Sequence, residues 1–175
     1  AGGCDINGDH VQDLVVGGYP LTTQQAYVIF GKKSGWPASG EAWTNDFLDG
    51  TKGFKIKGYS GASGQFSFTG LKCLKSYNGD EYDDILIGDT RRSTTTTIEY
   101  GYASMVYGKA DWSSTPEINL GTMAASTGVL FVPDTYQKQN TGRITTGLDI
   151  DLDGHIDIVI TGYTAQSAKG VAHVI

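Results

Sequence analysis

Residues 149–162 read DIDLDGHIDIVITG, an acidic loop that runs directly into an apolar, β-branched segment. The same arrangement occurs at 5–18, DINGDHVQDLVVGG, and at 76–88, SYNGDEYDDILIG. The three segments begin 71 and 73 residues apart, and similarity at a nearly constant period indicates a repeat architecture. We number the nine loop positions from the first residue of each segment, so loop 1 is residues 5–13, loop 2 is 76–84 and loop 3 is 149–157.

Further β-type runs recur in phase with the loops. One kind follows each loop after a short gap, at 26–31, 103–108 and 171–175. A second kind alternates apolar and polar residues, at 53–58 and 64–73, and its counterparts one period later are 129–132 and 143–148. The pattern predicts about four strands per repeat and contains no helical periodicity.

The run that follows each loop is apolar on both faces, at 14–16, 85–87 and 158–160. A strand of this kind is expected to be covered on both sides, as in the inner strands of stacked sheets. Four short antiparallel strands per repeat, stacked face to face, are typical of the blades of a β-propeller. The polar connectors 32–52 and 109–127 are expected to be surface loops.

The predicted fold is therefore all-β, a propeller segment that spans residues 1–175. The repeats are approximately 5–75, 76–148 and 149–175, so both ends fall within a repeat. Because a propeller has at least about four blades, we expect an incomplete propeller of about two to three blades. Such a segment would be a fragment of a longer protein or would pair with other copies.

Composition excludes several classes of protein. Thirteen Lys and Arg against 19 Asp and Glu give a net charge of −6, which disfavours nucleic-acid binding. No apolar run reaches the ~18 residues of a membrane span. The 25 glycines and 39% hydrophobic residues disfavour disorder and coiled coil, and fit a turn-rich β protein. Cys4 and Cys73 permit one disulfide, but the favoured interpretation is two small buried thiols.

The loop pattern Asp-x-Asp/Asn-x-Asp-x-x-x-Asp suits a cation. Oxygens at positions 1, 3 and 5 can converge in a tight turn, and position 9 can close a shell of the hard oxygen ligands that Ca²⁺ prefers. An EF-hand is excluded because it needs Glu at position 12, which here is Val16, Ile87 and Ile160. His10 and His155 have no Cys or second His nearby, which disfavours zinc. The alternative is a set of polar turns in which Asp and Asn cap backbone N–H groups.

Signals for catalysis are weak. Residues 58–62, GYSGA, resemble a nucleophile elbow but end in Ala and precede a strand, not a helix. Three tryptophans, Trp36, Trp43 and Trp112, lie in or near the connectors. They are either platforms for carbohydrate or, as we favour, anchors that pack the connectors onto a sheet. The chain is expected not to be an enzyme.

These motifs resemble FG-GAP repeats, the blades of the β-propeller of integrin α-subunits. The aromatic–Gly motif of that family corresponds to Phe30-Gly31 and Tyr107-Gly108, and its Gly-Ala-Pro motif has only the weak match Gly61-Ala62-Ser63. The resemblance implies Ca²⁺ held by side chains at positions 1, 3, 5 and 9 and by the carbonyl of position 7. These ligands would be Asp5, Asn7, Asp9, Val11 and Asp13; Ser76, Asn78, Asp80, Tyr82 and Asp84; and Asp149, Asp151, Asp153, His155 and Asp157.

The resemblance also implies a place outside the cell or on its surface. The expected function is adhesion or assembly through a protein partner or further blades of the same propeller. The alternative is a module that binds a carbohydrate or lipid headgroup and is appended to a secreted enzyme.

Overall fold

The computed structural model describes residues 1–17, 25–36, 47–58, 68–93, 99–132, 141–162 and 170–175. Its strands within these ranges form three sheets, and no α-helix occurs in them. The strands are β1 (Gly2–Cys4), β2 (Asp13–Gly17), β3 (Gln25–Ile29), β4 (Gly53–Lys57), β5 (Phe68–Leu74), β6 (Asp84–Ser93), β7 (Glu99–Val106), β8 (Glu117–Asn119), β9 (Gly128–Phe131), β10 (Thr141–Leu148), β11 (Asp157–Gly162) and β12 (Val171–Val174).

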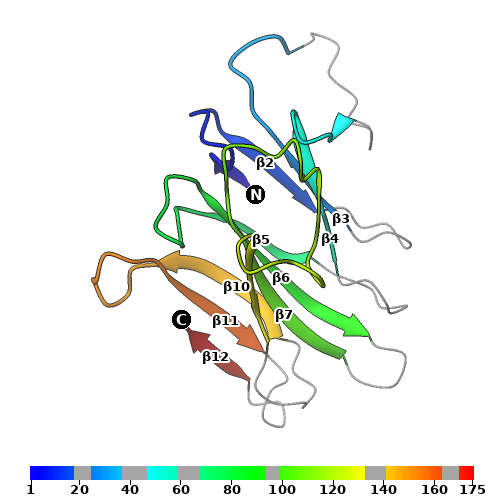
Figure 1. The fold of residues 1–175 in the computed structure, drawn as a ribbon. Helices are drawn as coiled ribbons and strands as arrows, with labels where there is room; N and C mark the ends of the chain where they lie inside the picture. The colour runs from blue at the N-terminus through cyan, green and yellow to red at the C-terminus, as the bar shows by residue number, and fades with distance from the viewer. Residues whose placement is uncertain (18–24, 37–46, 59–67, 94–98, 133–140, 163–169) are drawn as a thin grey trace.

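The three sheets share one plan (Figure 1). The first sheet has the order β1-β2-β3-β4-β8, the second β5-β6-β7-β9 and the third β10-β11-β12. All neighbouring strands are antiparallel except β4 and β8. Loops 1, 2 and 3 each join the first strand of a sheet to the second. The prediction of an all-β protein with a repeated strand pattern is confirmed.

The predicted strand ranges are recovered closely. The runs that follow the loops after a short gap are β3, β7 and β12, and the alternating runs are β4, β5, β9 and β10. Residues 64–67 of the predicted strand 64–73 lie outside the described residues.

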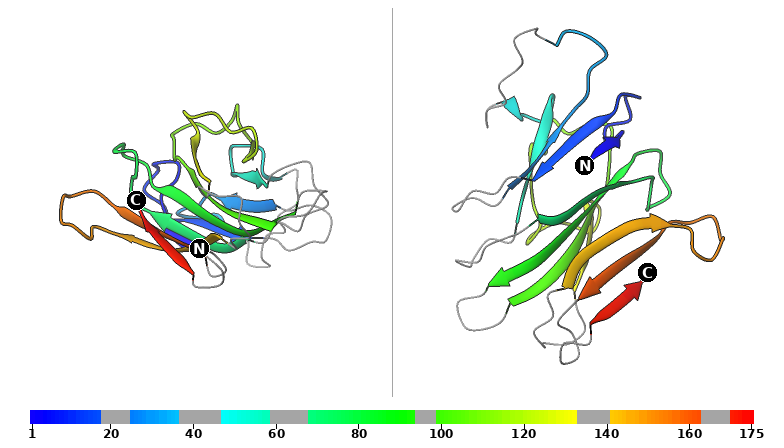
Figure 2. Two further views of the ribbon diagram at one scale, coloured as in Figure 1. Left: turned by 90° about the horizontal axis from the view of Figure 1, so that it is seen from below. Right: turned by 180° about the vertical axis from the view of Figure 1, so that it is seen from behind.

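The sheets are stacked (Figure 2), and the buried apolar residues form two cores. The first core joins the first and second sheets through residues such as Val15, Phe54 and Ile85, and the second joins the second and third sheets through residues such as Leu86 and Ile158. Because Ile85 and Leu86 are neighbours on β6 and belong to different cores, both faces of this strand are covered. The expected covering of residues 85–87 on both sides is confirmed.

The same expectation is wrong for the two outer sheets. On β2, Val15 is buried, whereas Leu14 and Val16 on the opposite face are 40% and 39% exposed. On β11, Ile158 and Ile160 are buried and Val159 between them is half-buried. The outer faces of the first and third sheets meet no further sheet in the described part of the chain.

The connector 109–127 is not a simple surface loop, which corrects the prediction. It arches over the neighbouring strands (Figure 2) and contributes β8, which continues the first sheet beside β4. Trp112, Ile118 and Leu120 from this segment belong to the first core. These three buried side chains anchor the segment to the core, while its other residues are exposed or half-buried.

The two cysteines are bridged, contrary to the favoured interpretation of separate thiols. Cys4 lies at the end of β1 and Cys73 lies on β5, the first strands of adjacent sheets, and their Cα atoms are 5.3 Å apart. This separation falls in the range that a disulfide requires. The two cysteines are 69 residues apart in sequence, so their proximity follows from the stacking of the sheets and could not be predicted from local sequence.

Candidate metal centre

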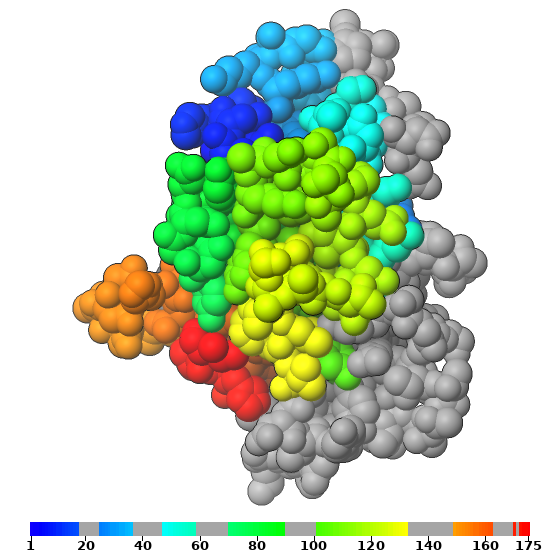
Figure 3. Space-filling view, in the orientation of Figure 1, coloured from blue at the N-terminus to red at the C-terminus, as the bar shows by residue number. Residues whose placement is uncertain are grey.

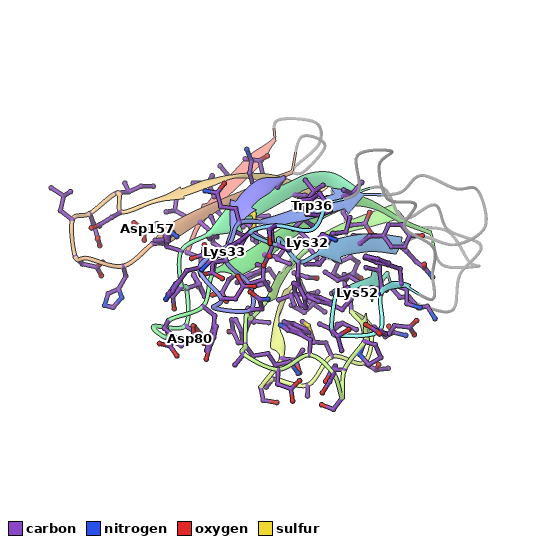
Figure 4. The ribbon with its side chains drawn as sticks, turned by 90° about the horizontal axis from the view of Figure 1, so that it is seen from above. Lys32, Lys33, Trp36, Lys52, Asp80 and Asp157 are labelled. Carbon is purple, nitrogen blue, oxygen red and sulfur yellow. A yellow bond between two sulfur atoms is a disulfide. The ribbon has the colours of Figure 1, made fainter. Side chains whose placement is uncertain are left out.

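The three acidic loops lie along one side of the stacked sheets (Figure 1). Figure 4 shows Asp80 of loop 2 and Asp157 of loop 3 toward this side. The common position follows from the fold, because each loop connects the same two strands of its sheet.

The three loops have the same internal hydrogen bonds. The N–H of position 2 donates to the carboxylate of position 9, at 2.8, 2.7 and 2.7 Å in the pairs Ile6–Asp13, Tyr77–Asp84 and Ile150–Asp157. The N–H of position 7 donates to the carboxylate of position 5, at 2.8 Å in Val11–Asp9, Tyr82–Asp80 and His155–Asp153. Three segments of different sequence therefore adopt one loop geometry.

Position 4 is left-handed in every loop. Gly8 and Gly79 have φ of 72° and 82°, which glycine adopts without steric cost, and Leu152 has φ of 65° at the same position of loop 3. A leucine in this region carries strain of about 1–2 kcal/mol. Loop 3 holds this conformation without the residue that favours it.

The carboxylate at position 9 explains the aromatic–Gly motif. Asp13 accepts a hydrogen bond from the N–H of Gly31 at 2.9 Å, and Asp84 accepts one from the N–H of Gly108 at 2.9 Å. A Cβ on Gly31 would lie 2.3 Å from the carbonyl oxygen of Gln12, and one on Gly108 would lie 2.4 Å from that of Asp83. Glycine is therefore required for the strand end to reach the loop.

Loop 3 contains the strongest cation-binding geometry. Asp149, Asp151 and Asp153, at positions 1, 3 and 5, each offer a carboxylate oxygen, and these oxygens lie within 4.8 Å of one another. Ligands at ~2.3–2.6 Å from one Ca²⁺ are separated by no more than about 5 Å, so the three oxygens fit one shell. No other group of three acidic, His or Cys residues in the described ranges meets this criterion. Asp157 is not part of the group and instead accepts the N–H of Ile150.

Loop 1 contains an unsatisfied carboxylate oxygen. Oδ2 of Asp5 accepts the N–H of His10 at 2.9 Å, whereas the buried Oδ1 has no hydrogen-bond partner. A buried, unpaired carboxylate oxygen is costly unless a cation or water satisfies it. Loop 1 therefore passes a chemical test for a cation ligand, with Asn7 and Asp9 beside Asp5.

The two most buried loop carboxylates are perturbed by their surroundings. Burial raises the pKa of Asp13 to about 6, in spite of hydrogen bonds from Gly31 and Ile6 that lower it. Burial also raises the pKa of Asp84, against hydrogen bonds from Gly108 and Tyr77. A nearby cation would favour the charged form of both groups.

Loop 2 has the fewest carboxylates at the proposed ligand positions, because only Asp80 and Asp84 are acidic there. The hydroxyl of Ser76 at position 1 donates to Asn78 at 3.0 Å and to Asp80 at 3.3 Å. The hydroxyl thus uses the oxygens that a cation would need at positions 3 and 5. Its neutral oxygen can still act as a ligand if the hydroxyl hydrogen turns away.

Sequence reasoning missed two functional neighbours of the loops. It found the aromatic–Gly motif but not its contact with position 9, since the separations Asp13–Gly31 and Asp84–Gly108 differ in length. It also assigned no role to Asp83, at position 8 of loop 2, which accepts the N–H of Asp5 at 2.9 Å. The available signal was an acidic residue where loops 1 and 3 have Gln12 and Ile156.

Of the two tryptophans in the described ranges, one is buried and the other is exposed. Trp112 is 1% exposed and stacks on Phe54 with ring centroids 3.7 Å apart, so the predicted anchoring of the connector is confirmed for this residue. Trp36 is 47% exposed, and the ammonium of Lys32 lies 4.4 Å from its ring centroid (Figure 4). Three predicted features lie outside the described residues: Trp43, residues 59–62 of the elbow-like segment, and the Gly61-Ala62-Ser63 match.

No protein-family model and no curated protein matches this chain. The described residues include no helix that is both long and apolar enough to span a membrane.

Proposed function

We propose that the chain is a non-enzymatic, Ca²⁺-binding segment of an FG-GAP-type β-propeller that acts outside the cell or on its surface in adhesion or assembly. The observation that carries the proposal is the convergence of three carboxylates in loop 3 within a geometry that all three loops share. Polar turns alone would not require three carboxylates at 4.8 Å or less from one another, because like charges repel.

The proposed ligands are the oxygens at positions 1, 3 and 5, the carbonyl of position 7 and the carboxylate of position 9. Ca²⁺ accepts six to eight such oxygens and tolerates irregular geometry, whereas Mg²⁺ demands a near-ideal octahedron. When bound, the cation would neutralise the cluster and hold the two strands joined by each loop in register. Its role in this proposal is structural.

The open faces of the outer sheets support assembly with further blades or with a protein partner. Leu14 and Val16 are exposed on β2, and Val174 is exposed on β12 opposite the half-buried Val159. Apolar faces of this kind gain free energy when another sheet covers them. The Cys4–Cys73 disulfide supports an oxidising compartment, since such bonds persist outside the cytosol.

The alternative of a carbohydrate- or lipid-binding module is not favoured by a described contact. Exposed Trp36 is the residue that would stack on a sugar, but one face of its ring is next to Lys32. We therefore keep adhesion or assembly as the proposed function.

The test is thermal unfolding of the protein with Ca²⁺ and with chelator. A ligand that binds only the folded state stabilises it by about 2.7 kcal/mol at a hundredfold excess over Kd. We expect Asp153→Ala to lose most of the Ca²⁺-dependent stabilisation of loop 3, because it removes a charged ligand from the acidic group. Ser76→Ala is the matched control and should lose less, because it removes a neutral oxygen.

Equal melting temperatures with and without Ca²⁺ in the unchanged protein would show that the loops are only polar turns. Equal losses in the two variants would show that loop 3 is not the dominant site.

A further inference from the structure

Loops 1 and 2 contact each other through two hydrogen bonds between Asp5 and Asp83. The N–H of Asp5 donates to Oδ2 of Asp83 at 2.9 Å, and the N–H of Asp83 donates to the carbonyl of Asp5 at 3.0 Å. Asp5 is position 1 of loop 1, and Asp83 lies between positions 7 and 9 of loop 2. Two hydrogen bonds thus join a proposed ligand of loop 1, Asp5, to the residue between two proposed ligands of loop 2, Asp83.

Side chains fix this contact from both loops. Lys75, just before loop 2, donates to both carboxylate oxygens of Asp83 at 3.1 and 3.0 Å, and the Asp83 side chain is largely buried. Gly8 of loop 1 lies against the ring of Tyr82, at position 7 of loop 2, so closely that a Cβ would lie 2.6 Å from the ring. Cys4, which is bridged to Cys73, immediately precedes Asp5 in the chain.

Loop 3 lacks the group that makes this link. Its position 8 is Ile156, whose side chain cannot accept a hydrogen bond. Loop 3 projects from the body of the molecule (Figure 3), whereas loops 1 and 2 belong to the two sheets that share the first core.

We propose that loops 1 and 2 form one coupled cation-binding unit, that Asp83 transmits order between them, and that loop 3 binds its cation independently. This inference rests on the proposed Ca²⁺-binding function. A cation in loop 2 fixes positions 7 and 9 and therefore the backbone of Asp83 between them. Fixed Asp83 holds the backbone of Asp5 in place, so less ordering remains when loop 1 binds its own cation. By thermodynamic linkage, loop 1 assists loop 2 by the same factor.

The test is a Ca²⁺ titration of the full 175-residue chain followed by NMR. The amides of Gly8, Gly79 and Gly154 lie in loops 1, 2 and 3 and serve as reporters of these loops. Asp80→Ala disables loop 2, and we expect it to raise the Ca²⁺ concentration at the Gly8 midpoint by about fivefold or more, the lower end of typical coupling. Asp153→Ala disables loop 3 and is the matched control, with an expected change at Gly8 of less than about twofold.

Variants of Asp83 test the route of the coupling. In an Asp83→Ala background, Asp80→Ala should move the Gly8 midpoint clearly less than in the unchanged background, because the carboxylate that accepts the Asp5 N–H is gone and only the backbone N–H of residue 83 still bonds to Asp5. Asp83→Asn retains an acceptor and Lys75→Met retains the whole carboxylate, so both should preserve the coupling. Without Ca²⁺, hydrogen exchange at the Asp5 amide should be faster in Asp83→Ala than in Asp83→Asn. This second measurement does not depend on metal binding.

The outcomes separate the inference from the function on which it rests. An unchanged Gly8 midpoint in Asp80→Ala, with Ca²⁺ still bound at loop 1, would overturn the coupling and leave the proposed function intact. An equal shift of the Gly8 midpoint in Asp153→Ala would also overturn it, because the effect would then be general. If none of the three glycine amides responds to Ca²⁺, the proposed function fails and the coupling with it.

Discussion

Asp13 combines three demands in one buried carboxylate. It closes loop 1 through the N–H of Ile6, holds the aromatic–Gly motif through the N–H of Gly31, and stands at position 9 of the proposed ligand set. Burial is the largest influence on its pKa and raises it to about 6. The charged form that a cation needs is therefore the form that the cation-free fold disfavours.

This conflict predicts a pH dependence of stability. Because the pKa of Asp13 is higher in the folded state than its usual value near 3.8, the folded state holds more protons between about pH 4 and 6. In chelator, the free energy of unfolding should fall as pH rises through this window, by up to roughly 3 kcal/mol from this residue. Saturating Ca²⁺ should remove the fall.

Urea unfolding at pH 4.5 and pH 7 in chelator measures this effect. Asp13→Asn is compared with the unchanged protein, since Asp84 remains in both and its raised pKa acts in the same direction. The difference between the two pH values should be smaller in the variant. The same difference in both proteins would contradict the assignment to Asp13.

Gly31 allows a further test of the contact between loop 1 and the end of β3. In Gly31→Ala the new Cβ would meet the backbone oxygen of Gln12, which can move only if the end of loop 1 moves. We expect a loss of about 2–3 kcal/mol of stability, as in other overpacked sites. Gly2→Ala is the control, because its Cβ would have only ordinary contacts at 3.8 Å or more. Similar stability of the two variants in urea unfolding would contradict the close approach.

Among the structural elements, β1 and β5, the first strands of two adjacent sheets, carry the covalent link between these sheets. The Cys4–Cys73 bridge closes a loop with a sequence separation of 69 residues. Constraint of the unfolded chain by a loop of this length is worth up to about 4 kcal/mol. We expect the double variant Cys4→Ser, Cys73→Ser to lose roughly 2–4 kcal/mol of stability.

Urea unfolding with and without reductant, beside mass spectrometry under non-reducing conditions, checks this prediction. Reductant should destabilise the unchanged protein and have no effect on the double variant. Two free thiols in the unchanged protein would contradict the bridge.

The elements also show where sequence patterns suffice. Alternation and β-branching predicted β3, β4 and β7, because local residue patterns decide strand formation. Local patterns did not predict β8, because this strand depends on non-local contacts. It pairs with the edge of β4, and Ile118 packs into the first core. Local patterns also did not predict the disulfide, because Cys4 and Cys73 become neighbours only when the first and second sheets stack.

Over the whole molecule, the repeat predicted three similar sheets and the equivalent positions of their loops. Matching acidic positions located the group Asp149, Asp151 and Asp153, which the structure brings together. The pattern could not reveal that position 9 accepts the N–H of the aromatic–Gly motif, because this donor lies 18 residues along the chain in one case and 24 in the other. It also could not show that Asp83 links two loops, since that contact requires the sheets to be stacked.

The parallel strand β8 limits where this chain could be truncated without exposing a sheet edge. Residues from the second repeat complete the first sheet, with the N–H of Lys55 bonded to Pro116 and that of Leu120 bonded to Lys57. A cut between β7 and β8 would leave β4 as an open edge, a template for pairing between molecules. To avoid an exposed sheet edge, a fragment of this chain that contains the first sheet must therefore also contain β8.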